Sequence, residues 1–326
     1  MRIANPLYDS VFKFLMEDPD CARTVIATIT GLDIIRVDPR PTELLAEFGA
    51  GLLVYRLDFC AHVKLSDGSF QLVLIEIQKA KESEDIMRFR RYLGEQYSNP
   101  SNIVPDLPPE LPPVPMPVLS IYLLGHKLSG LPEVPAIKVE RQQRDAITGE
   151  ILPGRSRFIE CLTHDSFIIQ IPNLHEAARN SLERLLSFFD QHRKDPRDNH
   201  TLIIDESQVP TEFRPVLRRL SRAGESEEIR QKMTVEDEVL SSLLREERAK
   251  LAAIERADKA EADKLKAEAD KVKAEADKLK AEADKQRIAF NSAEMLRSAQ
   301  VSEDRILQAT GIDFAQLEDW ICAGRP

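Results

Sequence analysis

The chain has 326 residues, 42% of them hydrophobic, which is enough for about two domains with one substantial core. The formal net charge of -10 excludes a protein coated in basic residues for packaging nucleic acid, although it allows a local basic patch. The four cysteines are widely spaced, the N-terminus lacks a signal-peptide pattern, and no run approaches the ~20 apolar residues of a membrane span, so we expect a cytoplasmic protein with reduced thiols and no membrane partner.

The first third of the chain alternates helical and strand patterns. Residues 6–30 predict helix from a first turn at Pro6 to a stop at Gly31, divided in two at Pro19. Two β-branched, apolar runs at 52–65 and 69–79 then flank a turn triplet and predict a β-hairpin. The second run is almost entirely apolar, so we expect it at the centre of a sheet, covered on both faces.

The next part of the chain is interrupted by proline. Prolines are dense from 100 to 117, which predicts a stiff, extended loop without packed structure. The other expected elements are strands at 33–38, 118–125 and 166–171 and helices at 82–98, 175–192 and 211–222.

Residues 260–287 hold four tandem copies of a seven-residue unit, AEADKLK, AEADKVK, AEADKLK and AEADKQR. Ala, Glu and Lys favour helix, and opposite charges such as Glu261 and Lys264 lie three residues apart. Small or apolar residues alternate at spacings of three and four, as the a and d positions of a coiled coil do. They are Ala262, Leu265, Ala269, Val272, Ala276, Leu279 and Ala283. Alanine buries little area, so association would be weak, and a solvated helical arm is the alternative.

Polar residues interrupt both strands of the predicted hairpin. Asp58 lies in the first strand, and Glu76 and Gln78 lie in the second. A carboxylate in a buried strand costs several kcal/mol unless it is paired or bound to a metal. Two carboxylates from neighbouring strands suit a hard divalent cation such as Mg²⁺, which prefers oxygen ligands. Such an ion assists phosphodiester hydrolysis by activating water and by stabilising charge on the phosphate.

The register of the hairpin decides whether these acids meet. A two-residue turn at Asp67-Gly68 would pair Asp58 with Ile77 and send Glu76 to the opposite face. A three-residue loop, Ser66-Asp67-Gly68 with a left-handed glycine, would pair Asp58 with Glu76. Type I turns that end in a left-handed glycine favour the second register, in which Gln78 shares the same face.

Several motifs together resemble a known nuclease family. Asp58, followed after seventeen residues by Glu76 in Ile-Glu-Ile-Gln, resembles the D…ExQ version of the PD-(D/E)XK signature. The run Asp9-Ser10-Val11-Phe12-Lys13 resembles the D-xx-FK opening of the Rpn (recombination-promoting nuclease) and transposase-like family. The run Arg88-Phe89-Arg90-Arg91-Tyr92 resembles the basic-aromatic helix of that family, and residues 306–321 resemble its ending. The resemblance covers residues 5–125 well and the C-terminal residues weakly.

The resemblance implies a fold, a site and an activity. The fold is α/β, with a restriction-endonuclease-like core of a mixed central sheet flanked by helices. Asp58 and Glu76 would bind Mg²⁺ or Mn²⁺, Gln78 would stand in the place of the usual catalytic lysine, and Asp9 would be a further acidic ligand from the first helix. The activity would be DNA cleavage linked to recombination or mobile elements. Glutamine in place of lysine leaves water activation open, and residues from about 126 to 300 match nothing in the family.

Basic residues near the predicted site suggest nucleic-acid contacts. They are Lys79, Lys81, Arg88, Arg90 and Arg91. Such clusters contact phosphates, although arginines on a helix are more often a solvated face. His62 shares the strand face of Asp58, and we expect it to be a packed, hydrogen-bonded histidine and not a ligand.

We therefore expect a nuclease-like domain at 1–225, a long charged helix or coiled coil at 226–300 and a short helical tail at 301–326. The expected function is Mg²⁺-dependent DNA cleavage by Asp58, Glu76 and Gln78, with no organic cofactor, because nucleotide-binding motifs are absent from the sequence. A homo-oligomer through the heptad arm is compatible with the repeats. The alternative is an inactive nuclease fold that binds DNA or tethers a partner through the arm.

Overall fold

The computed structural model describes residues 1–48, 51–56, 58–79, 85–105, 107–108, 110–174 and 178–324. The chain forms two compact units, Met1–Ser241 and Ser242–Pro326. The first unit is α/β and extends beyond the expected boundary at 225, because Ile229 and Met233 at the start of the long helix are buried in its core. Within the described residues, no helix is long and apolar enough to cross a membrane.

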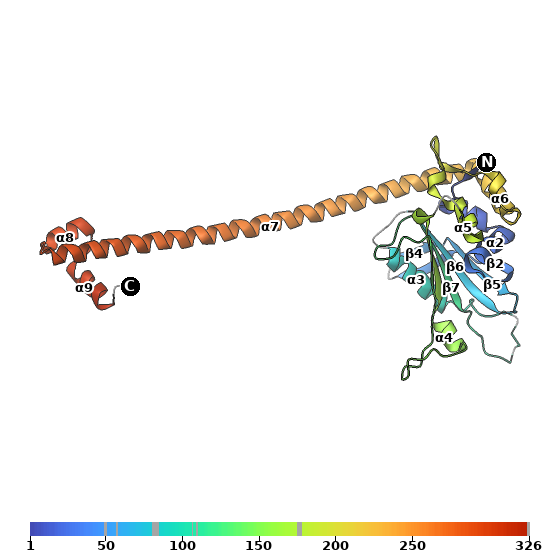
Figure 1. Ribbon diagram of the computed structural model, residues 1–326, viewed down its shortest axis with the longest axis horizontal. Coiled ribbons are helices and arrows are strands. Elements are labelled where there is room, and N and C mark those ends of the chain that lie inside the picture. The colour runs from blue at the N-terminus through green and yellow to red at the C-terminus, as the bar shows by residue number, and fades with distance from the viewer. Residues whose placement is uncertain are drawn as a thin grey trace. The chain divides into compact units, whose positions relative to one another are not determined.

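The colours of Figure 1 follow the strands and helices along the chain, and several of them are labelled there. The strands are β1 (Arg2–Ala4), β2 (Ile34–Pro39), β3 (Glu43–Phe48), β4 (Gly51–Arg56), β5 (Phe59–Leu65), β6 (Phe70–Gln78), β7 (Val118–Leu124), β8 (Ala136–Val139), β9 (Asp165–Gln170), β10 (Lys194–Asp195) and β11 (Asp198–Ile203). The helices are α1 (Asp9–Met16), α2 (Pro19–Thr30), α3 (Asp85–Ser98), α4 (Arg157–Leu162), α5 (Ser181–Leu186), α6 (Arg214–Glu225), α7 (Glu227–Ser298), α8 (Glu303–Thr310) and α9 (Phe314–Cys322).

A six-stranded mixed sheet organises the first unit, in the order β2-β5-β6-β7-β9-β8. Strand β6 pairs antiparallel with β5 and parallel with β7, so it lies inside the sheet, as its apolar sequence predicts. Smaller sheets join β1, β11 and β10, and β3 with β4. The α/β class and the mixed sheet are therefore confirmed.

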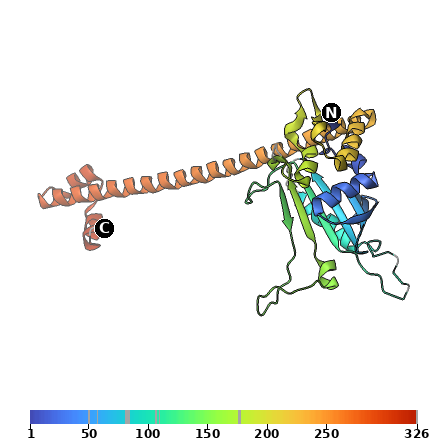
Figure 2. The ribbon, with the colours of Figure 1, turned by 45° about the vertical axis from the view of Figure 1, so that its right-hand side comes forward.

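Alternation along β5 and β6 gives the sheet two different faces. Val73, Ile75 and Ile77 point to the larger core, which also buries the apolar residues of α1 and α2. Figure 2 shows these two helices (blue) lying against the strands of the hairpin (cyan). Cys60 and Leu74 point to the opposite face and pack with Tyr92 of α3. Asp58, Glu76 and Gln78 have the parity of this second face.

Two expected elements differ from the sequence prediction. Helix α1 begins at Asp9 and not at Pro6, because the residues between β1 and α1 form a turn in which the Tyr8 amide donates to the Asn5 carbonyl at 3.2 Å. The single strand expected at 52–65 is divided, with β4 paired to β3 and β5 paired to β2 and β6.

The expected helix at 175–192 is also shorter. The Asn180 side chain accepts a hydrogen bond from the Glu183 amide and starts α5 at Ser181, and residues 175–177 lie outside the described part of the chain. Helix α5 then tightens into a 3₁₀ turn at 187–189, where Phe188 and Phe189 are buried.

The proline-rich loop is packed at both ends, which corrects the prediction of an extended loop without packed structure. Ile103 pairs with Pro115, and the Met116 amide donates to the Asn102 carbonyl at 3.0 Å. Asn102 and Met116 are buried. These contacts close the loop like a hairpin beside α3.

The second unit consists of most of α7 with a small C-terminal core. Helix α7 is continuous over 72 residues and contains all the heptad repeats. Helices α8 and α9, separated by the left-handed Gly311, bury Ile306, Leu317 and Trp320 against Ala293 of α7. Trp320 stacks on Phe290, with ring centroids 5.2 Å apart.

Candidate metal centre

The hairpin adopts the register that brings its acids together. Phe59 pairs with Ile75, and Lys64 pairs with Phe70. The Leu65 amide donates to the Ser69 carbonyl at 2.9 Å, and Gly68 has φ of +83°. The three-residue loop with a left-handed glycine is therefore confirmed. Continued by one residue beyond β5, this register places Asp58 opposite Glu76.

The two hairpin acids have different partners. The Ile77 amide donates to Asp58 Oδ2 at 2.5 Å, which fixes the half-buried Asp58 side chain against the end of β6. Glu76 is 4% exposed and receives a hydrogen bond from Arg88 on Oε1 at 3.1 Å. Its second oxygen, Oε2, is buried and accepts no hydrogen bond from the described residues. Half of the Glu76 carboxylate is therefore available to a further ligand.

Asp9 adds a third carboxyl group from the first turn of α1. Its Oδ2 accepts a hydrogen bond from Lys13 at 2.8 Å. Its Oδ1 is buried and has no hydrogen-bond partner among the described residues when both carboxyl groups are ionised, but a side-chain hydrogen bond with Asp9 contributes to the raised pKa of Asp58, so the two groups can share a proton. Phe12, between Asp9 and Lys13 in the sequence, is fully buried in the larger core and anchors this turn.

The pKa shifts of the two hairpin acids show the effect of burial and of the Asp9 charge. Burial raises the pKa of Asp58 well above its usual range, and the negative charges of Glu76 and Asp9 raise it further. Burial also raises the pKa of Glu76, to about 7, with a further contribution from Asp9, against the lowering effect of Arg88. The site therefore concentrates acidic groups whose ionisation a cation would favour.

Gln78 lies at the end of β6 and is buried at 6% exposure. Its Nε2 is buried without a hydrogen-bond partner among the described residues. Its backbone carbonyl accepts a hydrogen bond from the Gly125 amide at 2.6 Å. A Cβ atom on Gly125 would lie only 2.4 Å from the Lys79 carbonyl, so this close approach of β6 and the end of β7 requires glycine.

The arrangement suits a hard divalent cation but is not a closed coordination shell. Among the described residues, no group of three or more His, Cys, Asp or Glu side chains is close enough to hold a metal ion as arranged. The available donors are nevertheless oxygens, and one of them, Glu76 Oε2, is buried without a hydrogen-bond partner among the described residues. A buried carboxylate oxygen without a hydrogen-bond donor costs free energy, and a bound cation would offset that cost.

Lys79 points to the opposite side of the sheet, as strand alternation predicts. Its ammonium pairs with Asp237 of α7 and lies 3.4 Å from the centroid of the Tyr8 ring. Tyr8 also donates to Asp237, at 2.8 Å, and His200 bonds it at 3.0 Å. The nucleic-acid contact expected for Lys79 is therefore not supported, because its charge is already paired in a partly buried cluster.

Residues of α7 that the sequence analysis did not select support the start of α1. Glu236 accepts hydrogen bonds from the Asp9 and Ser10 amides at 2.9 Å each. Glu236 and Asp237 lie in a helix with the charge pattern of a solvated arm, so no local signal distinguishes them from its other acids.

The other predicted basic residues are in different environments. Arg88 contacts Glu76, which places it at the acidic site instead of on a free surface. Arg90 and Arg91 are exposed on α3. Lys81 lies outside the described residues. His62 hydrogen-bonds to Asn102 at 3.1 Å, which confirms a packed, hydrogen-bonded histidine.

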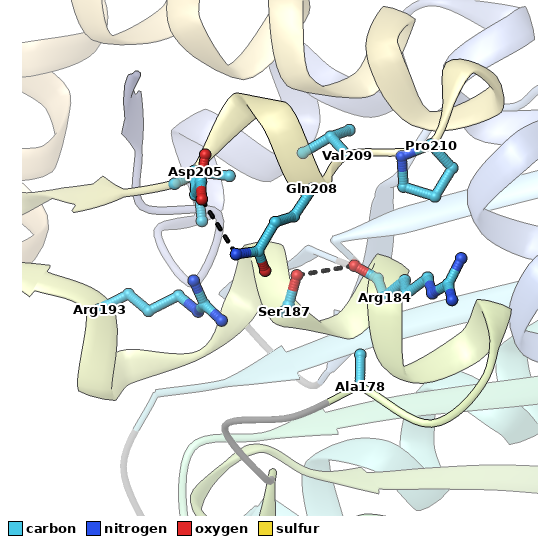
Figure 3. Close-up of a pocket in the computed structure, with 9 residues that line it drawn as sticks. Ala178, Arg184, Ser187, Arg193, Asp205, Gln208, Val209 and Pro210 are labelled. Carbon is cyan, nitrogen blue, oxygen red and sulfur yellow. Dashed lines mark hydrogen bonds between the residues drawn. The ribbon is translucent and has the colours of Figure 1, made fainter.

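A cavity of about 340 Å³ adjoins the site on the α3 face. It is bordered by Gln78, Phe89, Arg90 and Tyr122, among other residues. Figure 3 shows a different cavity, of about 360 Å³, where the Gln208 side chain donates to Asp205 and where Arg193 and Arg184 lie on opposite sides. The residues lining this second cavity include none of the predicted site residues, so it is separate from the acidic site.

No family model matches the sequence, and comparison with characterised proteins and with solved structures finds no match either.

Proposed function

We propose that the chain is a divalent-metal-dependent DNA endonuclease of the PD-(D/E)XK type, related to the Rpn family. The observation that supports this most strongly is the meeting of Asp58 and Glu76 at the end of β6, with the Asp9 charge acting on both. Buried carboxylates without enough hydrogen-bond donors are costly in a structural role and useful in a metal site.

Each residue has a role that its position suits. Asp58, Glu76 and Asp9 would hold Mg²⁺ or Mn²⁺ through their oxygens, and the ion would supply charge stabilisation and a more acidic water. Gln78 would orient the water or a phosphate oxygen through its unpaired amide, since an amide cannot remove a proton as a lysine can. The exposed Arg90 and Arg91 on α3 would contact the DNA backbone.

Cleavage of supercoiled plasmid DNA in Mg²⁺ or Mn²⁺ tests this function. We expect nicking by the wild-type protein and none by Asp58→Asn. Asp20→Asn is a matched control, because it removes the same charge from a side chain that is 82% exposed on α2. Equal nicking by all three proteins would identify a contaminant and reject the proposal. A parallel assay with single-stranded RNA determines whether RNA is also cut.

One observation favours a second function, an inactive nuclease fold that binds DNA or tethers a partner. Arg88 already neutralises part of the Glu76 charge, as a cation would. Mn²⁺ titration by calorimetry separates the two functions. An active site binds Mn²⁺ in the wild-type protein, whereas in an inactive one Mn²⁺ binds only after Arg88→Ala removes the competing guanidinium.

A further inference from the structure

The heptad repeats of α7 leave an apolar row uncovered. Leu265 is 63% exposed, and Val272 and Leu279 are each 67% exposed. The alanines between them, at 262, 269, 276 and 283, are exposed as well. A regular apolar row on an otherwise charged helix is a surface that a partner helix would bury.

The charges beside this row follow a strict pattern. With the alanines at position a and Leu265, Val272 and Leu279 at position d, every g position is acidic and every e position is basic. The g residues are Glu261, Glu268, Glu275 and Glu282, and the e residues are Lys266, Lys273, Lys280 and Arg287. Residues at e and g lie next to the apolar contact and determine partner choice and orientation.

We propose that residues 261–287 pair with the same residues of a second copy of this chain, as a parallel, in-register coiled coil. In a parallel pair, each g residue faces the e residue five positions further along the other helix. Glu261 would therefore face Lys266 of the second copy, and the same pairing repeats in every heptad. The sequence is complementary to itself in this arrangement.

The antiparallel arrangement of the same helices is disfavoured by the same charges. It brings e residues next to e residues and g residues next to g residues. Lysines would then lie beside lysines and glutamates beside glutamates along the whole paired length, which is destabilising. Because alanine at a buries little area, the small apolar contribution does not override this preference.

The paired segment has a boundary at each end. Before it, Glu255 falls at an a position and Asp258 at a d position, so pairing there would bring like charges together. After it, the a position is Phe290, which already stacks on Trp320 of the C-terminal core. Both boundaries coincide with the ends of the repeats.

The competing state is a single solvated helix stabilised by its own ion pairs. Along 260–287, the ion pair that the structure gives joins Arg287 and Asp284, at 2.9 Å. None of the glutamates at g forms an ion pair there within the described chain. Their charges are therefore open to a second helix.

Charge-reversal variants of the full chain test the partner by sedimentation equilibrium. One variant carries Lys266→Glu, Lys273→Glu and Lys280→Glu, and the other carries Glu261→Lys, Glu268→Lys and Glu275→Lys. We expect the wild type to form dimers, and each variant alone to dimerise about tenfold more weakly or worse. An equimolar mixture should regain the wild-type affinity as a heterodimer. A monomeric wild type, or a mixture no stronger than its components, would overturn the proposal.

Cysteine cross-linking tests the orientation. Ala262→Cys and Ala283→Cys, each in a background with Cys161→Ser and Cys322→Ser, lie roughly 31 Å apart along one helix. In a parallel, in-register dimer each variant forms a disulfide with its own copies, because facing a positions are within disulfide reach. In an antiparallel pair the a positions face d positions of the other helix, so a dimer in which neither variant forms a disulfide with its own copies would reject the proposal.

The proposal is independent of nuclease activity, because both experiments measure association and not cleavage. A dimer that cuts no DNA would leave it intact, and a monomeric nuclease would refute it.

Discussion

The Glu236 carboxylate accepts hydrogen bonds from the Asp9 and Ser10 amides, at 2.9 Å each, and so supplies from α7 the cap that the Tyr8 side chain does not provide for α1. Free amides at a helix N-terminus need an acceptor, and a negative charge there also interacts favourably with the helix dipole. The start of α7 thus supports the turn that carries one of the three carboxyl groups of the candidate site.

Glu236→Ala should therefore lower the Mn²⁺ affinity of the site more than it lowers the stability of the fold. Loss of a cap costs about 1 kcal/mol of stability. Because the first turn of α1 would loosen, we expect a further loss of about tenfold in Mn²⁺ affinity, as is typical when residues that support metal ligands are removed. Calorimetric titration and thermal unfolding measure the two effects.

Glu238→Ala is the matched control, because Glu238 is an exposed acid two residues further along the same helix. It should leave both quantities unchanged. Equal Mn²⁺ affinities of the Glu236 variant, the control and the wild type would show that the cap does not contribute to metal binding.

Asp237→Asn should destabilise the first unit, with a defined pH dependence. Burial raises the pKa of Asp237, but hydrogen bonds from Lys79, Tyr8 and His200 outweigh it and hold the pKa below its usual range. A carboxyl group with a lowered pKa stabilises the fold above its ordinary pKa, and that stability is lost as the pH falls through the folded-state value.

The stability difference between wild type and Asp237→Asn should therefore be largest near neutral pH and shrink below about pH 4. Urea unfolding at several pH values measures it. A difference that does not change with pH would mean that Asp237 stabilises the fold through packing and not through its charge.

The sequence predicted the elements whose signals are local. The Ser66-Asp67-Gly68 turn determines the register of the β5–β6 hairpin, because a left-handed glycine selects the three-residue loop. Gly31 ends α2 in the left-handed conformation for the same reason. With the register set, the pairing of Asp58 and Glu76 follows by counting.

The sequence did not predict contacts between distant segments. Glu236 and Asp9 are separated by 227 positions, and only the packing of the start of α7 on the first unit brings them together. The pairing of Arg88 with Glu76 was missed for a related reason, since arginines on a helix after a strand suggest either solvent or phosphate. The pairing of β4 with β3 was also missed. It divides the strand that was expected at 52–65, and no short sequence pattern indicates that division.

Stability without metal should fall as the pH rises from about 4.5 to about 7. The pKa of Glu76 is raised to about 7 from its usual 4.5, so the fold favours the neutral acid. A raised pKa gives stability that is full below the unfolded-state pKa and is lost as the pH rises through the folded-state pKa. The loss is on the order of 1–3 kcal/mol, and Glu76→Gln should remove it.

Metal binding should have the opposite pH dependence. The carboxyl groups must lose protons to bind a cation, so Mn²⁺ affinity should increase between pH 5 and about 8, with release of protons. Calorimetry in two buffers of different ionisation enthalpy measures the number released. Mn²⁺ binding that is insensitive to pH would place the ion away from Asp58 and Glu76.

Gly125→Ala should disrupt the end of β6, whereas Gly94→Ala should be harmless. A Cβ on Gly125 would lie 2.4 Å from the Lys79 carbonyl and 3.0 Å from the Gln78 carbonyl, so the two backbones must separate. We expect a loss of stability of about 2 kcal/mol or more and weaker metal binding, because Gln78 and Glu76 share this strand end.

A Cβ on Gly94 meets nothing within 4 Å, and alanine in the interior of α3 should stabilise the protein by up to about 1 kcal/mol. Thermal unfolding of both variants measures these opposite effects, and a tolerated alanine at 125 would show that the ends of β6 and β7 can separate at little cost in stability.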